Sequence, residues 1–412
     1  MFAEIISIGD ELLIGQTINT NAGWMGEVLN VAGFRVRRVL TISDNRDEIL
    51  RNLDEACAHS DIVLLTGGLG PTKDDITKKT LADYFDDSLI FDQIAYDNII
   101  ELFGKYNRDV GELNRQQAYV PSTCIPIKNK QGTAPGMWFE KEGKVIVSMP
   151  GVPYEMKSMM TGFVIPELKK RFRTPSVVHK TILTQGIPES ELAEKISEWE
   201  DALPDHIRLA YLPGAGMVKL RLSGVGEKEE NIKEQIDTLF KDLEKYIPGE
   251  IIGPEDEKLE MVIGNLLRER GQTLCTAESC TGGTIAHLIT SVAGSSDYFK
   301  GAVVAYANEI KQNLLDVKEK DLINHGAVSS QVVRQMAEGA RQKFGTDYAI
   351  ATSGIAGPGG GTDEKPVGTI WIAIATPGET LVKHYQFGDD RHRNITRTAL
   401  TALNLMRKAM KD

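Results

Sequence analysis

The stretch that decides the fold is IVLLTGGLGPTKDD, residues 62–75. Residues 62–66 form a continuous apolar run, which is typical of a strand buried on both faces of a parallel sheet. The run ends at Gly67, and Gly68 and Gly70 follow closely. Glycine accepts positive φ and a close backbone approach, so the N–H groups of such a turn can form a concavity for an anion. The stretch therefore predicts a buried strand, a glycine-rich turn and the start of a helix.

Strands and helices alternate on both sides of this turn, from residue 2 to about residue 170. Apolar runs at residues 5–8 and 34–42 precede the central strand, and an amphipathic helix at residues 49–58 follows the second run. A hairpin-like pair of strands comes later, at residues 136–139 and 144–148. Such alternation is the pattern of a parallel sheet that helices cover on both faces.

The pattern changes after residue 174. A small α+β unit is predicted there, with strands at 177–184, 207–211 and 217–223 and helices at 189–200 and 229–245. Pro and Gly residues between positions 248 and 254 predict a linker. Alternation then returns, with strands at 273–277, 301–305, 348–353 and 369–376 and helices at 330–344 and 394–410.

These patterns predict an α/β protein of more than one core, as the length of 412 residues also favours. Two three-layer α/β/α domains, residues 1–172 and 251–412, are expected on either side of a small α+β domain at residues 173–250. Residues 251–257 are expected to be the linker into the last domain.

Composition excludes several classes of function. The net charge of −11 argues against an extended nucleic-acid surface, which needs clustered Lys and Arg. No apolar run approaches the roughly 18 residues of a membrane span, and no secretion signal is evident at the start of the sequence. The cysteines lack the spacing of a zinc site or a disulfide framework; they are Cys57, Cys124, Cys275 and Cys280. We expect a reduced, cytoplasmic protein that binds neither membranes nor nucleic acid.

The first candidate site is the turn after residue 66. Thr72 offers a hydroxyl donor, Lys73 a positive charge, and Asp74 and Asp75 the carboxylates for a divalent cation that bridges phosphate oxygens. An ordinary tight turn with an Asp helix cap is the alternative.

Further loops are expected at the same edge of the sheet. Gly9-Asp10-Glu11 follows the first strand and Asp44-Asn45 the second, and ligands gather at the carboxyl ends of parallel strands. Two rigid Gly/Pro loops, residues 132–136 and 150–153, are expected to wall this site. The residues alone thus indicate a phosphorylated ligand with a metal ion.

The second candidate site begins at Ser279, between a strand and a helix. N–H groups at a helix start can hold a phosphate or receive the oxyanion of acyl transfer, although Ser is also an ordinary helix cap. A nucleophilic Ser needs a base, and a partly buried Lys311 is one route, although a solvated Lys is commoner. The histidines near this region, His287, His325 and His392, show no clear carboxylate partner in the sequence.

A second glycine-rich loop lies at residues 352–361, and Lys365 follows it. Hydroxyls, many N–H donors and one Lys suit a nucleotide phosphate. A purely structural loop needs fewer glycines, so the functional interpretation is favoured.

The first domain resembles the amino-terminal half of CinA proteins, which is similar to the molybdopterin-binding fold. The matching motifs are GDELLIGQTINTNA at 9–22, TGGLGPTKDDIT at 66–77, GTAPG at 132–136 and MPGVPYEM at 149–156. The resemblance implies hydrolysis of ADP-ribose to AMP and ribose 5-phosphate with a divalent metal (Mg²⁺ or similar), and K⁺ is a further candidate ion. It matches Asp75 and Asp44 to the acidic pair of the wider fold and the Gly67–Thr72 turn to its phosphate loop. The phosphate-binding residues are thus expected to be Gly67, Gly68, Gly70, Thr72 and, from its charge, Lys73. The expected metal ligands are Asp75 and Asp44, joined by Asp74 and Asp10 from their positions at the strand ends.

The last domain resembles the nicotinamide-nucleotide amidase half of the same family. The motifs are AESCTGG at 277–283, GSSDYFKGAVVAYANEIK at 294–311, HGAVS at 325–329, SGIAGPGGG at 353–361 and EKPVGT at 364–369. The resemblance implies deamidation of nicotinamide mononucleotide to nicotinate mononucleotide and ammonia, without a cofactor. Ser279 is then the nucleophile, with Lys311 and Tyr306 as acid/base partners and Ser353 close to the reacting centre. From the helix start and the glycine-rich loop, the expected substrate- or phosphate-binding residues are Thr281, Gly282, Gly283, Gly354, Gly357, Gly359 and Lys365. Cys280 is the rival nucleophile.

The middle unit resembles a KH-type domain, but the nucleic-acid clamp GXXG is not evident, because residues 213–216 read PGAG. We expect a spacer and a homodimer contact. A bifunctional hydrolase of pyridine-nucleotide salvage is the favoured hypothesis. The alternatives are a regulatory protein linked to competence and a molybdopterin- or nucleotide-binding protein without catalysis in its first domain.

Overall fold

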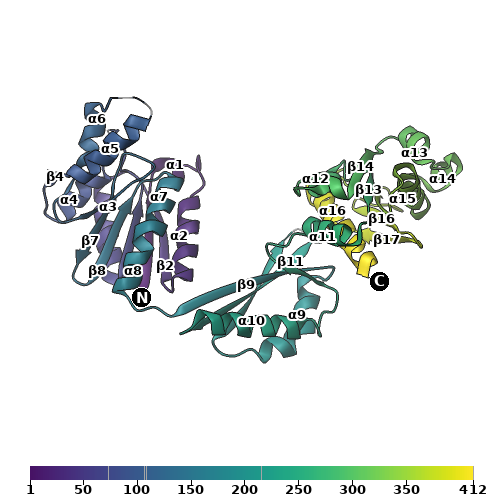
Figure 1. The fold of residues 1–412 in the computed structure, drawn as a ribbon, viewed down its shortest axis with the longest axis horizontal. Coiled ribbons are helices and arrows are strands. Elements are labelled where there is room, and N and C mark those ends of the chain that lie inside the picture. Colours follow the sequence, from purple (N-terminus) through teal and green to yellow (C-terminus); the bar gives the residue numbers. More distant parts are fainter. Residues whose placement is uncertain (73, 106, 108, 215, 412) are drawn as a thin grey trace. The chain divides into compact units, whose positions relative to one another are not determined.

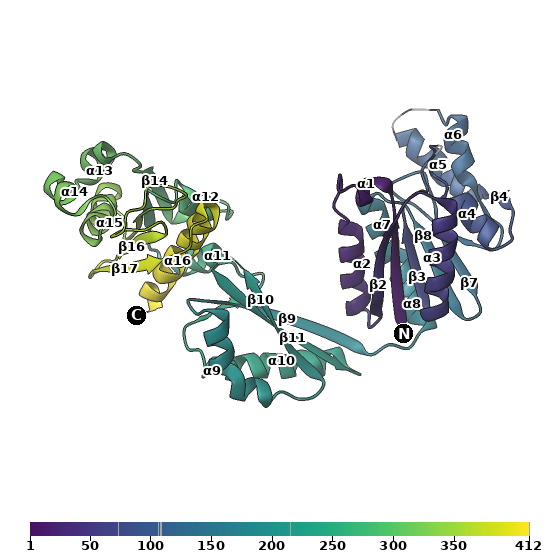
Figure 2. The same cartoon turned by 180° about the vertical axis from the view of Figure 1, so that it is seen from behind.

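The computed structural model describes residues 1–411 apart from 73, 106, 108 and 215. The chain forms two compact units, Met1–Val178 with Val225–Ile232, and His179–Gly224 with Lys233–Asp412. Figure 1 shows their helices and strands, and Figure 2 shows the same ribbon from behind. No helix among the described residues is long and apolar enough to cross a membrane.

The first unit is built on one mixed sheet with the strand order β2-β1-β3-β8-β7-β6. Its strands are β1 (Phe2–Ile8), β2 (Arg35–Ile42), β3 (Ile62–Thr66), β6 (Ile125–Ile127), β7 (Gly136–Lys141) and β8 (Lys144–Met149). The strands β2, β1, β3 and β8 are parallel, whereas β7 and β6 are added antiparallel. The sequence prediction of a parallel sheet with a late hairpin is confirmed.

Helices cover both faces of this sheet, as Figures 1 and 2 show. They are α1 (Asp10–Leu13), α2 (Thr20–Val31), α3 (Arg46–His59), α4 (Thr77–Tyr84), α7 (Pro153–Met159), η2 (Met160–Val164) and α8 (Ile165–Arg171). On one face Leu29 of α2 and Met156 of α7 pack on Ile5. On the other, Leu53 of α3 and Leu81 of α4 pack on Leu65. Because successive strand residues point to opposite faces, an apolar strand supplies both cores at once.

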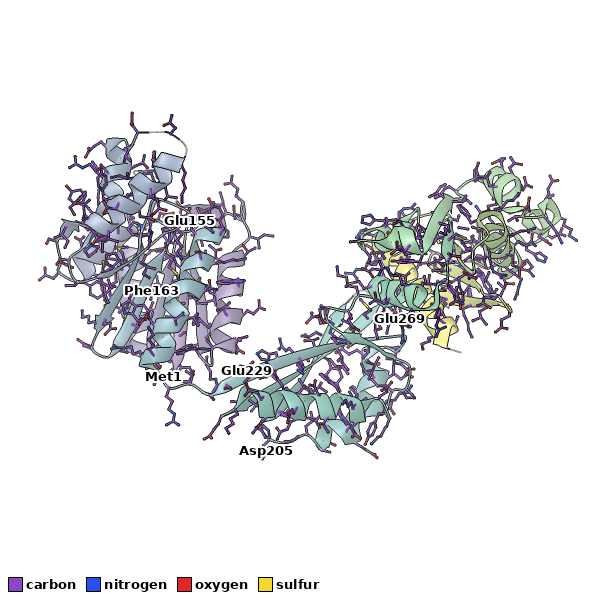
Figure 3. All side chains as sticks on the ribbon, in the orientation of Figure 1. Met1, Glu155, Phe163, Asp205, Glu229 and Glu269 are labelled. Carbon is purple, nitrogen blue, oxygen red and sulfur yellow. The ribbon has the colours of Figure 1, made fainter. Side chains whose placement is uncertain are left out.

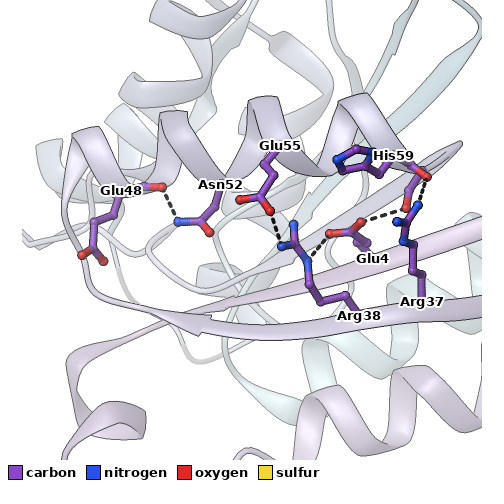
Figure 4. A network of polar contacts seen from close by, with 8 residues as sticks. Glu4, Arg37, Arg38, Glu48, Asn52, Glu55 and His59 are labelled. Atoms are coloured by element: carbon purple, nitrogen blue, oxygen red, sulfur yellow. Dashed lines mark hydrogen bonds and ion pairs between the residues drawn. The ribbon is translucent and has the colours of Figure 1, made fainter.

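A polar network holds α3 against the edge of the sheet (Figure 4). Glu4 of β1 is buried, and its carboxylate accepts hydrogen bonds from Arg38 (2.8 Å) and from the Ser60 hydroxyl (3.0 Å). Arg38 also donates to Glu55 on α3, at 2.6 Å. The charge of Glu4 is thus paired inside the protein, which offsets the cost of removing it from water.

A small subdomain follows α4 and was not apparent in the sequence. It contains β4 (Leu89–Phe91), α5 (Gln93–Lys105), α6 (Glu112–Arg115), η1 (Gln116–Ala118) and β5 (Tyr119–Pro121). The strands β4 and β5 pair antiparallel, and Ala95, Ile99 and Ala118 form a core of their own. Strands of three residues carry too few alternating positions to be predicted from periodicity.

The second unit begins with a four-stranded sheet in the order β10-β11-β9-β12. Its elements are β9 (Ser176–Gln185), α9 (Glu189–Asp201), β10 (Ile207–Gly214), β11 (Met217–Gly226), α10 (Glu229–Leu243) and β12 (Ile251–Pro254). The strands and helices predicted for the middle domain are confirmed. The linker prediction is wrong at its start, because Ile251–Pro254 forms an edge strand antiparallel to β9. Gly and Pro are tolerated on edge strands, so they do not by themselves mark a linker.

The rest of the second unit is a three-layer α/β/α domain with the strand order β14-β13-β15-β16-β17. Its strands are β13 (Leu274–Glu278), β14 (Phe299–Val304), β15 (Tyr348–Gly354), β16 (Thr369–Ala375) and β17 (Thr380–Gln386). One core lies under α11 (Leu259–Arg270), α12 (Thr284–Thr290) and α16 (Arg391–Lys411). The other lies under α13 (Asn308–Leu315), α14 (Glu319–His325) and α15 (Ser330–Phe344). A short helix, η3 (Ser295–Asp297), precedes β14.

Candidate functional sites

The loops after β1, β2 and β3 meet at one edge of the first sheet. The N–H of Gly9 donates to the carbonyl of Ile42 (3.1 Å), and the N–H of Asp10 donates to the carboxylate of Asp44 (3.1 Å). A Cβ placed on Gly68 would lie 3.5 Å from the same carboxylate. The parallel topology thus brings together three loops that lie far apart in the sequence, as expected for strand ends in an open sheet.

Close backbone approach explains the glycines of the turn after β3. Gly67 has φ +114°, and a Cβ there would collide with the carbonyl oxygen of Ile8. At Gly68, with φ +64°, a Cβ would collide with the hydroxyl of Thr77 on α4. Only glycine allows the turn to pass so near its neighbours without strain. The predicted strand–turn–helix is confirmed, with α4 beginning later than expected.

Thr72 and Asp75 are engaged with each other. The N–H of Thr72 donates to the Asp75 carboxylate at 2.9 Å, and the Thr72 hydroxyl donates to the same oxygen. Both groups therefore close the turn, and their roles in phosphate and metal binding stay predictions. Lys73 lies outside the described residues.

The surroundings of Asp44 change the pKa of its carboxylate. Burial raises its pKa, and the negative charges of Asp10, Glu11 and Asp74 raise it further, whereas the hydrogen bond from the Asp10 N–H lowers it. The hydrogen bond with Thr72 lowers the pKa of Asp74. Crowded carboxylates of this kind attract a cation, and oxygen donors suit a hard divalent ion. Among the described residues, however, no group of three His, Cys, Asp or Glu side chains is arranged to hold a metal ion.

A buried carboxylate that sequence reasoning missed lies beside the same turn. The N–H of Gly67 donates to the carbonyl of Met149 (3.0 Å), so the loop after β8 adjoins the glycine turn. Glu155, on α7 two residues into the helix, accepts a hydrogen bond from the Asn129 amide at 2.6 Å, and burial raises its pKa. Figure 3 shows Glu155 toward the end of the sheet opposite to Met1, which is the carboxyl end of β1. The loop at 132–136 is adjacent, because Gly132 packs on the Glu155 carboxylate.

In the second unit, Ser279 stands directly after β13. Its N–H donates to the carbonyl of Thr352 at the end of β15 (3.0 Å), and Gly282 donates back to the Ser279 carbonyl (3.2 Å). Gly282 and Gly283 both have positive φ, which the turn requires before α12 can begin. The hydroxyls of Thr281 and Thr352 share a hydrogen bond of 2.8 Å. The expected strand, turn and helix around Ser279 are confirmed.

The N–H groups at the start of α12 already have an acceptor inside the protein. Those of Gly283, Ile285 and Ala286 donate to the carboxylate of Glu278 at 2.8–3.1 Å. The sequence predicts anion binding at this helix start; that prediction is wrong for the N–H groups of Gly283, Ile285 and Ala286, because Glu278 occupies them. The N–H of Cys280 interacts with its own thiol, and the described residues give no hydrogen bond for the N–H of Thr281.

Lys311 is almost completely buried, with 1% of its surface exposed. Its amine donates to the carbonyls of Ala305 (2.8 Å) and Tyr306 (3.0 Å), and burial lowers its pKa. The N–H of Ala305 donates to the carbonyl of Glu278, so the amine is held beside the strand end that precedes Ser279. Lys311 and Cys280 interact electrostatically. In the described residues no hydrogen bond joins Lys311 to the Ser279 hydroxyl.

Tyr306 meets Lys311 through its carbonyl rather than its phenol. The side chain is 63% exposed, and its hydroxyl accepts a hydrogen bond from Arg391 at 3.3 Å. Arg391 also donates to the carbonyl of Gly357 in the glycine-rich loop, at 2.7 Å. The guanidinium thus connects Tyr306 with this loop, and sequence reasoning missed it because a helix-start Arg has no distinctive pattern.

The remaining predicted residues lie around the same strand ends. The Ser353 hydroxyl is buried and donates to the carbonyl of Ala327 (2.7 Å), while Lys365 donates to the carbonyl of His325 (2.6 Å). Gly354 and Gly357 pack so closely on neighbouring backbone that a Cβ would collide, whereas Gly359 faces open space. His287, His325 and His392 are exposed. The roles assigned to these residues stay predictions.

Three family models match consecutive parts of the chain. "Probable molybdopterin binding domain" matches residues 4–170, "Damage-inducible protein CinA KH domain" residues 179–253, and "CinA C-terminal domain" residues 256–410. A CinA-like protein from Cytophaga hutchinsonii is 48% identical over an alignment of 416 positions, which covers 100% of this chain and 99% of the relative. The chain belongs to the CinA family.

Two less similar relatives match different shares of the chain. A protein of Halothermothrix orenii described as "Putative competence-damage inducible protein" is 38% identical and aligns with 100% of this chain and 99% of its own. A solved structure, the competence/damage inducible protein CihA from Agrobacterium tumefaciens, is 38% identical over 37% of this chain and 96% of its own, with a TM-score of 0.36.

Proposed function

We propose that the carboxyl-terminal domain is an amidase that converts nicotinamide mononucleotide to nicotinate mononucleotide and ammonia. The observation that carries the proposal is the buried amine of Lys311, held by two carbonyls beside the strand end that leads into Ser279. A neutral amine can donate two hydrogen bonds to these carbonyls and keep its lone pair as a proton acceptor. Burial favours that neutral form, as a general base near neutral pH requires.

The steps follow from these positions. Lys311 accepts the proton of the Ser279 hydroxyl, and the alkoxide forms a bond to the carboxamide carbon. The N–H groups of Cys280 and Thr281 receive the oxyanion. Protonated Lys311 returns the proton to the leaving nitrogen, ammonia departs, and water hydrolyses the acyl–serine ester with the same base. The amine must turn toward Ser279 for this, and catalytic hydrogen bonds commonly tighten only when substrate binds.

Three features support a nucleotide as the substrate. The loop at 354–361 offers N–H donors, and Lys365 and Arg391 place positive charge beside it. Arg391 spends donors on the Gly357 carbonyl and the Tyr306 hydroxyl, and its remaining N–H groups can bind a phosphate.

Ammonia release from nicotinamide mononucleotide tests this proposal. Ser279→Ala is expected to abolish release, and Cys280→Ala is the matched control in the adjacent position. Full activity of Ser279→Ala together with loss in Cys280→Ala would assign the nucleophile to Cys280.

For the amino-terminal domain we propose a second activity. It hydrolyses the diphosphate bond of ADP-ribose to give AMP and ribose 5-phosphate. The crowded carboxylates around Asp44 support it, because like charges so close need a cation. Asp44, Asp10 and Asp74 would hold a divalent ion such as Mg²⁺ together with diphosphate oxygens, and Asp75 would join them on leaving Thr72. Because no three such side chains are arranged for a metal ion among the described residues, diphosphate oxygens would have to complete the ligand set. The ion, when bound, neutralises the diphosphate charge; K⁺ is a further candidate.

Production of AMP from ADP-ribose, with and without a chelator, tests the second activity. Asp44→Asn is expected to stop it while ammonia release continues unchanged, because the two sites lie in different units. AMP production that survives both the chelator and Asp44→Asn would contradict the proposal.

A second candidate function is a regulatory protein linked to competence whose first domain binds a pterin or nucleotide without catalysis. Two observations favour it: the match to a molybdopterin-binding family model, and the description of a relative as "Putative competence-damage inducible protein". Absence of both activities, with tight pterin binding by calorimetry, would support this candidate. For either function we propose that the protein is cytoplasmic and forms a homodimer. Light scattering of the full chain tests the homodimer.

A further inference from the structure

Glu278 is a buried carboxylate with no positively charged side chain at ion-pair distance among the described residues. None of its surface is exposed. One carboxylate oxygen accepts the N–H groups of Gly283 (3.0 Å) and Ile285 (3.1 Å). The other accepts the N–H of Ala286 (2.8 Å) and the hydroxyl of Thr276 (3.3 Å). The charge is thus stabilised by three N–H groups at the helix start and by one hydroxyl of the preceding strand.

Such an arrangement is an unusual way to cap a helix. Burial of a carboxylate costs free energy that hydrogen bonds must offset, and a surface Ser, Thr or Asp at the cap position satisfies the same donors without that cost. The cap position of α12 is Gly283, which has no side chain to offer. Glu278 instead reaches from the preceding strand, so its carboxylate joins the end of β13 to the start of α12 across residues 279–282.

The hydrogen bonds of Glu278 occupy several backbone N–H groups of the turn. Ser279 is fixed by its N–H bond to Thr352, and the three inner N–H groups are taken by Glu278. The N–H of Cys280 interacts with its own thiol, and the described residues give no hydrogen bond for the N–H of Thr281. The bridge therefore sets the direction of the short backbone segment that carries Ser279 and Thr281.

We propose that Glu278 is the positioning residue of the amidase site. It holds the turn so that the Ser279 hydroxyl and the N–H groups of Cys280 and Thr281 serve one substrate carbonyl. The inference rests on the proposed amidase function and adds the group that organises it. Glu278 itself touches neither the substrate nor the reacting atoms.

Glu278→Gln is the decisive variant because both carboxylate oxygens accept N–H groups. An amide of the same shape directs its NH₂ at one of these donors in either orientation, so at least one hydrogen bond is lost. Glu260→Gln is the matched control, since Glu260 of α11 is also buried (5% exposed) in the same domain, and among the described residues no hydrogen bond joins it to the turn. Glu278→Asp keeps the charge and withdraws it by one carbon.

Kinetics and hydrogen exchange measure the effect. For Glu278→Gln we expect kcat for nicotinamide mononucleotide to fall about 100-fold, the cost of a small misplacement of reacting groups, with KM within about twofold. The pH profile of the remaining activity keeps its shape, because Glu278 moves no proton. Amide exchange at residues 283, 285 and 286 accelerates at least tenfold, while exchange in β15 does not change. Glu260→Gln matches the wild type in all of these.

Several results would overturn the inference. One is a normal kcat in folded Glu278→Gln, and another is a raised KM at unchanged kcat, which is the signature of substrate contact. If Glu278→Gln does not fold, Glu278→Asp is measured instead. Its kcat is expected to be lower than that of the wild type, with KM unchanged.

A wild type that releases no ammonia would refute the proposed substrate. The positioning role of Glu278 is then tested by the rate at which a serine-directed fluorophosphonate probe labels Ser279. Slower labelling of Ser279 in Glu278→Gln, with faster exchange at residues 283–286, supports positioning. Equal labelling, or no labelling of Ser279 in the wild type, overturns it.

Discussion

Replacement of Lys311 by methionine separates the proposed base from a structural lysine. Methionine has a similar length and no polar hydrogen, so the buried space stays filled while the amine is removed. The wild-type amine donates to the carbonyls of Ala305 and Tyr306 at 2.8 and 3.0 Å, and both contacts are lost in Lys311→Met.

The expected loss of activity is much larger than the change in stability. A positioned general base contributes about 10²–10⁴-fold, or roughly 3–5 kcal/mol of transition-state free energy. Two carbonyls left without a donor destabilise the fold by about 1–3 kcal/mol each, partly offset because no amine needs to be buried. We therefore expect a net change in unfolding free energy of about 2 kcal/mol or less.

The pH dependence provides an independent reading. Burial lowers the pKa of Lys311 from its ordinary 10.5, so kcat/KM rises with pH and levels off at a pH below 10.5, once the amine is neutral. Stability follows the same direction. Between the lowered pKa and 10.5 the unfolded chain binds the proton and the folded chain does not, so wild-type stability increases with pH there. Lys311→Met lacks this increase.

The assay combines ammonia release with urea unfolding over a range of pH. Lys311→Arg is the control, because arginine keeps a cation but cannot give up its proton at any pH tested. Two results would refute the reasoning. One is an activity of Lys311→Met within tenfold of the wild type. The other is a wild-type stability that, between the lowered pKa and 10.5, changes with pH in the same way as the stability of Lys311→Met.

Three further changes are expected to act at separate points. Gly67→Ala places a Cβ at φ +114° against the carbonyl of Ile8 and is expected to lower the unfolding free energy of the first unit by about 1–3 kcal/mol, measured by urea unfolding; an unchanged midpoint would contradict the close approach. Arg391→Met is expected to raise KM for nicotinamide mononucleotide about 10–100-fold with a smaller effect on kcat, and to leave hydrolysis of the nucleoside without phosphate unchanged. Burial raises the pKa of the Cys280 thiol to about 12, so iodoacetamide at pH 8 should modify it only after unfolding; rapid labelling of the native protein would show the thiolate to be accessible.

Much of the fold was predictable because its strands carry long, regular patterns. The apolar run of β3 and the glycines after it identified a buried parallel strand, and the strands around Ser279 followed from the same reasoning. The subdomain containing β4 and β5 was missed because strands of three residues have no usable period. The Gly and Pro of the edge strand β12 predict a linker, because both residues are also common in turns.

The candidate sites were predictable as positions but not as contacts. Residues such as Ser279 and Lys311 were found from their motifs, whereas the acceptors of the Lys311 amine and the partner of the Tyr306 hydroxyl were not. Glu278 lay within a quoted motif, yet nothing in the sequence distinguished its carboxylate from an exposed one.

By itself the sequence determined where strands enter glycine-rich turns, because backbone preference and hydrophobic period are local properties. Only the tertiary structure decided that Glu278 occupies the helix start and that Lys311 is buried at a neighbouring strand end. Burial and hydrogen-bond partners depend on which segments the sheet places side by side, and residues 278, 305 and 311 acquire their chemistry from that packing.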